Sequence, residues 1–308
     1  MALFFNKSAK ELSEKEYQKG VSELEAGAYR RAFRHFSDAA EAENDKAMLA
    51  LGTMYYKGLV LDPVEDETAE AEKWWKRSAS LGNAAAKVNL SMLYAYGKVK
   101  YRNYSLAREY MEEALASGEP GVREKLENMD QTAALQLTKA VKYYSEKHVE
   151  ESKLSMKDAM DLGSESTMFL CADMIDANML ESDEPSLTYY EKAAEKGSAD
   201  GAFRAAVRTD DAQKTIAYYN LAYERRSAEL MEYLEGLTYH DGEGTVKAVD
   251  DSTNRVLLST PEKKKLLVHA ENISDIHVGD RVVYEISDED HVCFGCREIR
   301  HVNQKEEA

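Results

Sequence analysis

Two cysteines near the end of the chain are the residues whose type and spacing most directly suggest chemistry. Cys293 and Cys296 form a C-x-x-C pair, and His291 and His301 flank it. Thiolates and imidazoles are zinc ligands, and such a pair can also cycle between thiols and a disulfide. A structural zinc site needs four ligands in a tetrahedron, whereas a spacing of three in a predicted strand places the two thiols on opposite faces. We therefore expect two strand cysteines, no metal and no cofactor.

Sequence motifs of the common enzyme classes are missing. The chain has no phosphate-binding glycine loop of the Walker or dinucleotide type, no G-x-S-x-G and no H-E-x-x-H. The remaining cysteine, Cys171, stands alone, so there is no disulfide framework and a reducing compartment is favoured. No apolar run approaches the roughly 18 residues that span a bilayer. We expect a cytoplasmic protein that is not an enzyme.

Tyrosines are the residues best suited to binding a protein partner. The chain has 19 of them, and tyrosine is enriched at interface anchors because it buries a large area and keeps a polar tip. Several lie beside the repeated pattern described below rather than within it. These expected partner-binding residues are Tyr56, Tyr96, Tyr143, Tyr144 and Tyr223. The competing interpretation is that they line the repeat core, and the pattern leaves both open.

Lysines near the end of the chain offer a second kind of binding. The net charge of −17 repels nucleic-acid phosphates except at a local basic patch. The run from Lys263 to Lys265 is expected at an exposed hairpin tip, where it could touch a phosphate or serve only as a solvated loop. Together with Lys247 and His269 it forms the candidate nucleic-acid surface.

A repeated pattern predicts the helices that position the tyrosines. A pair of residues, often bulky, is followed four positions later by a mostly small pair and, after eight, by glycine, as in Trp74-Trp75, Ser78-Ala79 and Gly82. Six copies begin at residues 35, 74, 110, 155, 189 and 218, and the first and last lack the glycine. Positions i and i+4 share a helix face, and glycine suits the left-handed residue that closes a helix. Two helices per ~36 residues bury their faces only by stacking, which predicts an α/α solenoid.

The interval between the third and fourth copies is the longest. It spans 45 residues, and it admits two interpretations. One is a bent joint between two half-solenoids near residues 120–135, with residues 121–130 as the tail of the first half. The other is an extra helix around residues 131–147. We assign residues 1–239 to the solenoid as a whole.

The best copies resemble Sel1-like repeats, which are related to the tetratricopeptide repeat. The matching residues are Ala47, Leu51, Gly52, Tyr55, Gly58, Ala71, Trp74, Ser78, Ala79, Gly82 and Asn83. The match is strong over residues 26–121 and weaker over 131–236. The resemblance implies a superhelix that acts as an adaptor or scaffold and holds partners on its concave face. It brings no catalytic residues.

After residue 240 the sequence changes to β-branched alternation. Five short strand candidates are separated by turn signals, which predicts a small all-β barrel over residues 240–308. The segment resembles a cold-shock-like OB-fold at "GTVK" from Gly244, "STPE" from Ser259, "LVH" from Leu267 and "VGDRV" from Val278. That family stacks bases on aromatic side chains. Where aromatics would stand, this sequence has Ala248, Val249, Val256, Leu257, Leu258, Leu267 and Ala270.

These observations favour a non-enzymatic adaptor. The solenoid would bind a protein or peptide, basic or amphipathic because the surface is acidic, and the barrel would be a second docking module. The alternative is that the barrel binds RNA or single-stranded DNA while the solenoid recruits a complex. Stacking platforms worth about 1–3 kcal/mol per base are missing, and residues 241–308 carry a net charge of −6. Both observations favour the adaptor.

Overall fold

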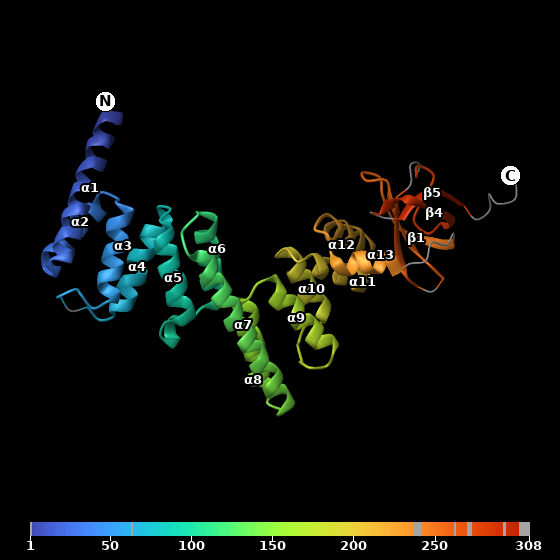
Figure 1. The fold of residues 1–308 in the computed structure, drawn as a ribbon, viewed down its shortest axis with the longest axis horizontal. Coiled ribbons are helices and arrows are strands. Elements are labelled where there is room, and N and C mark those ends of the chain that lie inside the picture. Colours follow the sequence, from blue (N-terminus) through green and yellow to red (C-terminus); the bar gives the residue numbers. More distant parts are fainter. Residues whose placement is uncertain are drawn as a thin grey trace. The chain divides into compact units, whose positions relative to one another are not determined.

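The structure is a computed structural model that describes residues 2–62, 64–236, 242–261, 263–269, 273–291 and 294–301. Thirteen α-helices and one short 3₁₀ helix precede five strands in these residues (Figure 1). The helices are α1 (Ala2–Glu25), α2 (Tyr29–Glu41), α3 (Asp45–Tyr56), α4 (Glu67–Ser80), α5 (Ala84–Tyr96), η1 (Val99–Tyr101), α6 (Tyr104–Ala116), α7 (Val122–Ser145), α8 (Val149–Leu162), α9 (Glu165–Asp176), α10 (Ser186–Glu195), α11 (Ala199–Arg208), α12 (Ala212–Glu224) and α13 (Ala228–Gly236). The strands are β1 (Gly242–Asp250), β2 (Arg255–Ser259), β3 (Lys265–His269), β4 (Arg281–His291) and β5 (Phe294–His301).

The chain divides into two compact units, Met1–Ala133 and Ala134–Ala308. The division falls inside α7, which runs without interruption from Val122 to Ser145. The tail and the extra helix expected on either side of residue 130 are therefore parts of one helix. The sequence analysis missed this helix because neither half of it carries the repeated pattern. In the structure, α7 buries Val122, Leu126 and Met129, whose spacing is that of one continuous helix. The half-solenoid and 239/240 boundaries stay predictions.

All six copies of the repeated pattern lie on helices, namely α2, α4, α6, α8, α10 and α12. The bulky residue of the pair packs against the preceding helix where that helix carries a small residue. A Cβ atom added to Gly52 of α3 would lie 2.5 Å from Trp75 Cδ1, and one added to Gly20 of α1 would lie 2.5 Å from Phe36 Cδ1. In these two pairs the aromatic ring therefore fills the space that the glycine of the preceding helix leaves open.

Three predicted helix-closing glycines adopt the left-handed conformation: Gly82, Gly118 and Gly197 have φ values of 92°, 75° and 120°. The two copies without glycine close in the same way, because Glu43 and Arg226 have φ values of 56° and 57°. The pattern therefore specifies the backbone turn even where the residue is unfavourable for it.

Gly163 is an exception. Its φ is −86° and its ψ is 171°, so the prediction of a left-handed residue is wrong at this position. Only Gly163 and Ser164 separate α8 from α9, and a Cβ atom on Gly163 would lie 2.3 Å from Thr167 Oγ1. Glycine is needed here for close approach rather than for its positive φ.

Side chains at helix starts tie successive pairs together. In the first unit, Asn83 caps α5 by accepting from Ala86 N at 3.0 Å, and its Nδ2 donates to Asp45 Oδ2 of α3 at 2.6 Å. In the second unit, Ser227 Oγ accepts from Leu230 N at 3.0 Å and donates to Asp200 Oδ1 of α11 at 2.6 Å. An acidic residue in the first turn of one helix thus binds the cap of a later one.

The five strands form a small, mainly antiparallel sheet. β1 pairs with β2 and β4, β2 pairs with β3, and β4 pairs with β5, all antiparallel. β3 and β5 meet in parallel over only two residue pairs, and with this contact the order β1-β2-β3-β5-β4 returns to β1. Val246, Val256, Leu258 and Val268 are fully buried in the core of the sheet.

Candidate protein-binding face

Two of the five predicted tyrosines stand at the ends of equivalent helices. Tyr56 ends α3 and is 52% exposed, and Tyr96 ends α5 and is 46% exposed. On α5, Met92 is also exposed and lies one turn before Tyr96, and the half-buried Val88 lies one turn before Met92. These three residues share one face of the helix because they are spaced by four. We use the name tyrosine face for Tyr56 of α3 together with Val88, Met92 and Tyr96 of α5.

Acidic side chains follow Tyr56 in the loop and the first turn of α4. Asp62, Glu65 and Glu67 are exposed. Burial raises the pKa of the neighbouring Tyr55 phenol, and the charges of Glu70 and Asp62 raise it further. The Tyr56 ring itself lies 5.3 Å from the ring of Trp75, centroid to centroid. Tyr56 is thus an exposed aromatic ring that rests on Trp75, and an acidic segment follows it in the chain.

The same loop is anchored to the next repeat through Asp66. Its carboxylate caps α4 by accepting from Thr68 N at 3.0 Å and from Ala69 N at 3.2 Å. It also accepts from Lys100 Nζ, and from Tyr101 OH at 2.5 Å. These two partners, Lys100 first, hold the pKa of the Asp66 carboxyl well below its usual range. Asp66, at the end of the loop, thereby joins the start of α4 to η1.

The other three predicted tyrosines are half-buried. Tyr144 packs against the cluster that contains Leu137 and Met156, and Tyr223 packs against the cluster of α11 and α12. The Tyr143 ring stacks on the His148 ring with centroids 6.3 Å apart. The core interpretation therefore fits Tyr144 and Tyr223 better than the interface interpretation.

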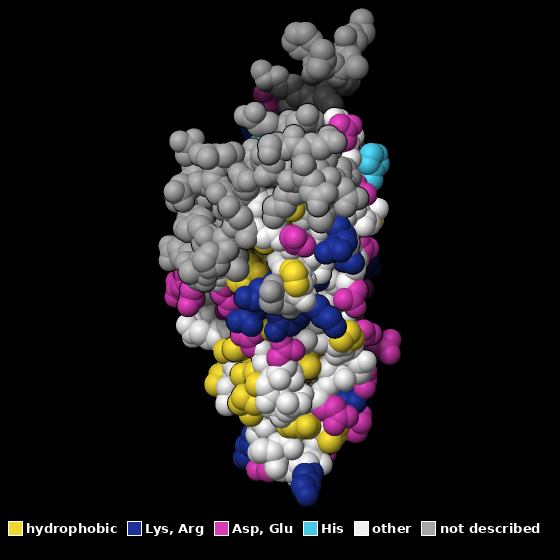
Figure 2. Space-filling model, turned by 90° about the vertical axis from the view of Figure 1, so that its right-hand side faces the viewer, with side chains coloured by type: hydrophobic (Ala, Val, Ile, Leu, Met, Phe, Trp, Pro, Cys, Tyr) yellow, Lys and Arg dark blue, Asp and Glu magenta, His cyan; other side chains and the backbone are white. Residues whose placement is uncertain are grey.

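The predicted nucleic-acid residues are divided by the structure. Lys247 is exposed beside an irregularity in the β1–β2 register, and Lys263 and Lys264 are exposed between β2 and β3. His269 is half-buried and lies opposite Arg255. On the face drawn in Figure 2, acidic and basic side chains are interspersed over the described residues.

Lys265 departs from the expected hairpin tip. It begins β3, and its Nζ donates to the backbone oxygens of Ala206 at 3.3 Å and Val207 at 3.2 Å, and to that of Thr209. Desolvation lowers the pKa of this ammonium group. The ammonium group is committed to the end of α11 because a cation is favourable where helix carbonyls lack partners.

The C-x-x-C motif lies only partly within the described residues. Cys293 lies outside the described residues, and so do the side chains of His291, Cys296 and His301, although their backbone is in β4 and β5. The prediction that this motif holds no metal is untested. Cys171 is buried in α9, and burial raises the pKa of its thiol to about 12, so it is not a reactive thiolate.

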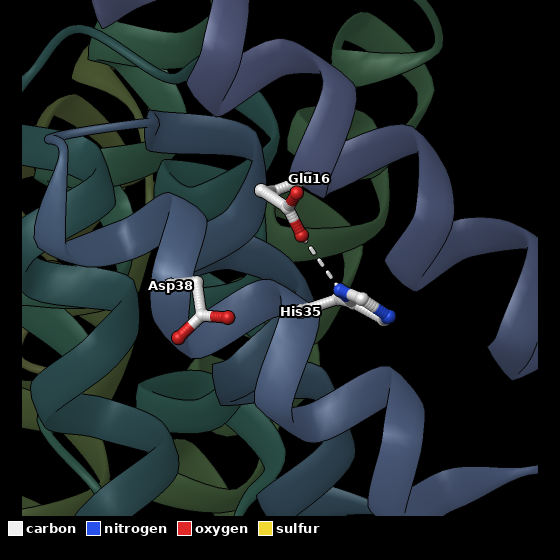
Figure 3. Close-up of side chains that lie close together, drawn as sticks. All are labelled: Glu16, His35 and Asp38. Atoms are coloured by element: carbon white, nitrogen blue, oxygen red, sulfur yellow. Dashed lines mark hydrogen bonds and ion pairs between the residues drawn. The ribbon is translucent and has the colours of Figure 1, made fainter.

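Among the described residues, Glu16, His35 and Asp38 bring potential ligand atoms within 4.8 Å of one another (Figure 3). His35 Nδ1 and Glu16 Oε2 share a hydrogen bond of 2.7 Å, and Lys19 Nζ binds Glu16 Oε1 at 2.7 Å. Both contacts, Lys19 first, lower the pKa of the Glu16 carboxyl. With a lysine already on the carboxylate and only three ligands for a metal, the geometry is that of a polar tie between α1 and α2.

Comparison with known proteins identifies Sel1 repeats in this chain. The profile of the Sel1 repeat matches residues 45–83, 84–119 and 184–198. The first two matches contain the helices of the tyrosine face. No curated protein is significantly similar to the chain. No helix of the described residues is long and apolar enough to cross a membrane.

Several solved structures are similar to the chain at low identity. A protective antigen of uropathogenic Escherichia coli that displays an SLR fold shares 18% identity with a TM-score of 0.33, over 76% of this chain and 51% of its own. A Sel1 repeat protein from Oxalobacter formigenes shares 20% with a TM-score of 0.32, over 71% and 89%. An immunity protein from Pseudomonas aeruginosa shares 17% with a TM-score of 0.28, over 70% and 83%. The chain thus spans about half the length of the first of these.

Proposed function

We propose that the protein is a non-enzymatic adaptor whose tyrosine face binds a protein or peptide in the cytoplasm. The observation that carries the proposal is the exposure of Tyr56 and Tyr96 at the ends of equivalent helices in two matched Sel1 repeats. A rigid aromatic side chain with a polar tip buries much area at a low entropic cost when a partner covers it.

The chemistry around the face supports a basic or amphipathic partner. Asp62, Glu65 and Glu67 are exposed in the segment that follows Tyr56, and the whole chain carries a net charge of −17. Opposite charges steer a partner toward the face and raise the association rate, an effect that salt weakens. An amphipathic helix would place its apolar side on Met92 and Tyr96 and its lysines toward the acidic loop.

The sheet is proposed as a small OB-like barrel that serves as a second docking module. The strand order, with β4 paired to β1 and β5 paired to β3, supports this assignment. Exposed groups that could contact a partner are Lys247, Lys263 and Lys264. Among the described residues of the sheet no exposed Phe, Tyr or Trp adjoins these lysines, which favours protein docking over nucleic-acid binding.

A peptide selection tests the proposed function. The full chain is panned against a phage-displayed random peptide library, and the enriched peptides are titrated by fluorescence anisotropy at low and high salt. We expect peptides rich in lysine or arginine that bind more weakly at high salt. Affinity should fall about tenfold or more in Tyr56→Ala/Tyr96→Ala and stay unchanged in Tyr29→Ala, an exposed tyrosine on α2. Acidic peptides, or equal affinity for all three proteins, would contradict the proposal.

A further inference from the structure

We infer that the sheet is the C-terminal cap of the helical repeats in the second unit. Its β1–β3 surface holds α11, α12 and α13 in the place that a further helix pair would occupy, and this surface is therefore closed to nucleic acid. The inference concerns a surface of the sheet distinct from the tyrosine face and does not depend on the proposed partner.

An apolar layer joins the strands to the helices. Ala248 of β1, Leu257 of β2 and Leu267 of β3 are 1%, 2% and 6% exposed. They form one buried cluster with residues of the last helices. The helix residues of this cluster include Phe203, Ile216, Tyr219, Ala222 and Leu230.

Neighbouring strand residues point the other way, into the core of the sheet itself. Val256 and Leu258 flank Leu257, and Leu266 and Val268 flank Leu267, and all four belong to the separate core cluster of the sheet. Side chains alternate between the faces of a strand. Both faces of β2 and β3 are thus buried, one by the sheet and one by the helices.

Polar contacts fix the sheet to all three helices. Lys265 Nζ binds backbone oxygens at the C-terminal end of α11. Arg255 Nη1 donates to Asn220 Oδ1 of α12, and Tyr233 OH of α13 donates to the Lys265 backbone oxygen at 3.4 Å. Desolvated cations that bind specific oxygens define one arrangement of sheet and helices, whereas an apolar layer alone would tolerate sliding.

A cap is what the last helix pair of a repeat stack requires. Each pair buries one face on the pair before it and offers the other to the next, so the terminal pair needs a different cover. Without the sheet, Ile216, Tyr219 and Leu230 would lose the strand residues packed against them. An uncovered apolar end of this kind promotes end-to-end association between copies.

The cap also explains the missing aromatics of the strands. A base-stacking surface needs exposed rings, whereas Ala248, Leu257 and Leu267 are buried against helices. Nucleic acid could contact this surface only after the helices had been displaced. A surface that is packed against helices and presents no stacking ring fits a cap and not a nucleic-acid platform.

Hydrogen–deuterium exchange of the full chain tests the cap with matched pairs of variants. Leu267→Asp places a charge in the apolar layer, and Val278→Asp does so at a position that is 66% exposed. Lys265→Met removes the ammonium group and keeps the stem, and Lys264→Met does so at the neighbouring exposed lysine. Size-exclusion chromatography with light scattering follows self-association.

For Leu267→Asp and Lys265→Met we expect amides of α11–α13 to exchange about tenfold faster or more, together with a shift toward oligomers. The two controls should match the wild type. Unchanged exchange in α11–α13 for Lys265→Met would overturn the inference, and this variant decides the question if Leu267→Asp unfolds the sheet. Binding of single-stranded RNA or DNA by the wild-type chain, with slowed exchange in β1–β3, would overturn it as well.

Discussion

Two residues that follow helices carrying the repeated pattern, Glu43 after α2 and Arg226 after α12, adopt a backbone conformation that is costly for them. Glu43 and Arg226 occupy the left-handed region that Gly82, Gly118 and Gly197 occupy in other copies. A side chain there costs roughly 1–2 kcal/mol, which glycine avoids. Both are exposed, so the larger side chain is not needed to fill the core.

Arg226→Gly should therefore stabilise the protein. We expect a gain of about 0.5–1 kcal/mol in the free energy of unfolding, because relief of the left-handed strain exceeds the entropy that glycine adds to the unfolded chain. Urea denaturation followed by circular dichroism measures it. The reverse change, Gly82→Ala, should cost about 1 kcal/mol. A destabilised Arg226→Gly would show that the arginine side chain contributes more than its conformation costs.

At the scale of elements, the contact between α3 and α4 depends on the absence of one methyl group. Gly52→Ala would place a Cβ atom 2.5 Å from Trp75 Cδ1. Because Trp75 is buried and its Nε1 donates to Leu49 O at 3.3 Å, the ring has little room to move. Overpacking of this kind costs about 1–3 kcal/mol.

A double-mutant cycle isolates that contact. Trp75→Leu removes the ring, so Gly52→Ala should cost much less in the Trp75→Leu background than in the wild type. The free energy of unfolding of the four proteins gives the coupling. Equal costs in the two backgrounds would show that the glycine matters for another reason.

The hydrogen bond from Asn83, at the start of α5, to Asp45 of α3 can be tested by replacing one atom. Asn83→Asp keeps the oxygen that caps α5 but replaces the donor to Asp45 by a like charge. We expect a loss of about 1–2 kcal/mol in unfolding free energy. Asn103 caps α6 in the same way, accepting from Leu106 N at 3.0 Å. In the described residues its side chain makes no hydrogen bond to an earlier helix. Asn103→Asp should change stability by less than about 0.5 kcal/mol, and an equal loss in both variants would contradict the role of this hydrogen bond.

The sequence predicted those elements whose signal is local. The repeated pattern predicted six of the thirteen described helices, because bulky and small residues recur at i and i+4. The β-branched runs predicted the five strands. The cap was missed because it pairs residues far apart in the chain, such as Lys265 with Ala206. A signal was present: Val256-Leu257-Leu258 and Leu266-Leu267-Val268 are unbroken apolar runs in antiparallel strands, which indicates burial on both faces.

The candidate site was predicted in part for a similar reason. The sequence predicts that the tyrosines beside the repeated pattern either bind a partner or line the core, and the pattern does not say which of them a later element covers. Tyr56 and Tyr96 end their helices and stay exposed, while Tyr144 and Tyr223 meet neighbouring helices. Exposure depends on packing partners that lie outside the local pattern.

For the whole molecule, carboxylates with lowered pKa values predict sensitivity to acid. Lys19 and His35 lower the pKa of Glu16, and Lys100 and Tyr101 lower that of Asp66. A carboxyl whose pKa is lower in the folded state stabilises it above the unfolded pKa of about 4, and this contribution is lost as the pH falls toward the folded pKa.

The midpoint of urea denaturation should therefore fall steadily below about pH 4 and change little between pH 5 and 7. The variant Lys19→Met/Lys100→Met removes the first cause of both shifts, so its midpoint should fall less over the same range. A variant whose pH dependence equals that of the wild type would show that other carboxyl groups account for the effect.

The central claim is that a protein partner covers the ends of α3 and α5. Site-specific photo-crosslinking tests it most directly, with benzoylphenylalanine replacing Tyr56, Tyr96 or, as the control, the exposed Tyr29. Expressed in its own cells and irradiated, the full chain should form the same discrete protein adduct from positions 56 and 96 and none from position 29. Adducts of equal yield from all three positions, or adducts with nucleic acid instead of protein, would contradict the account.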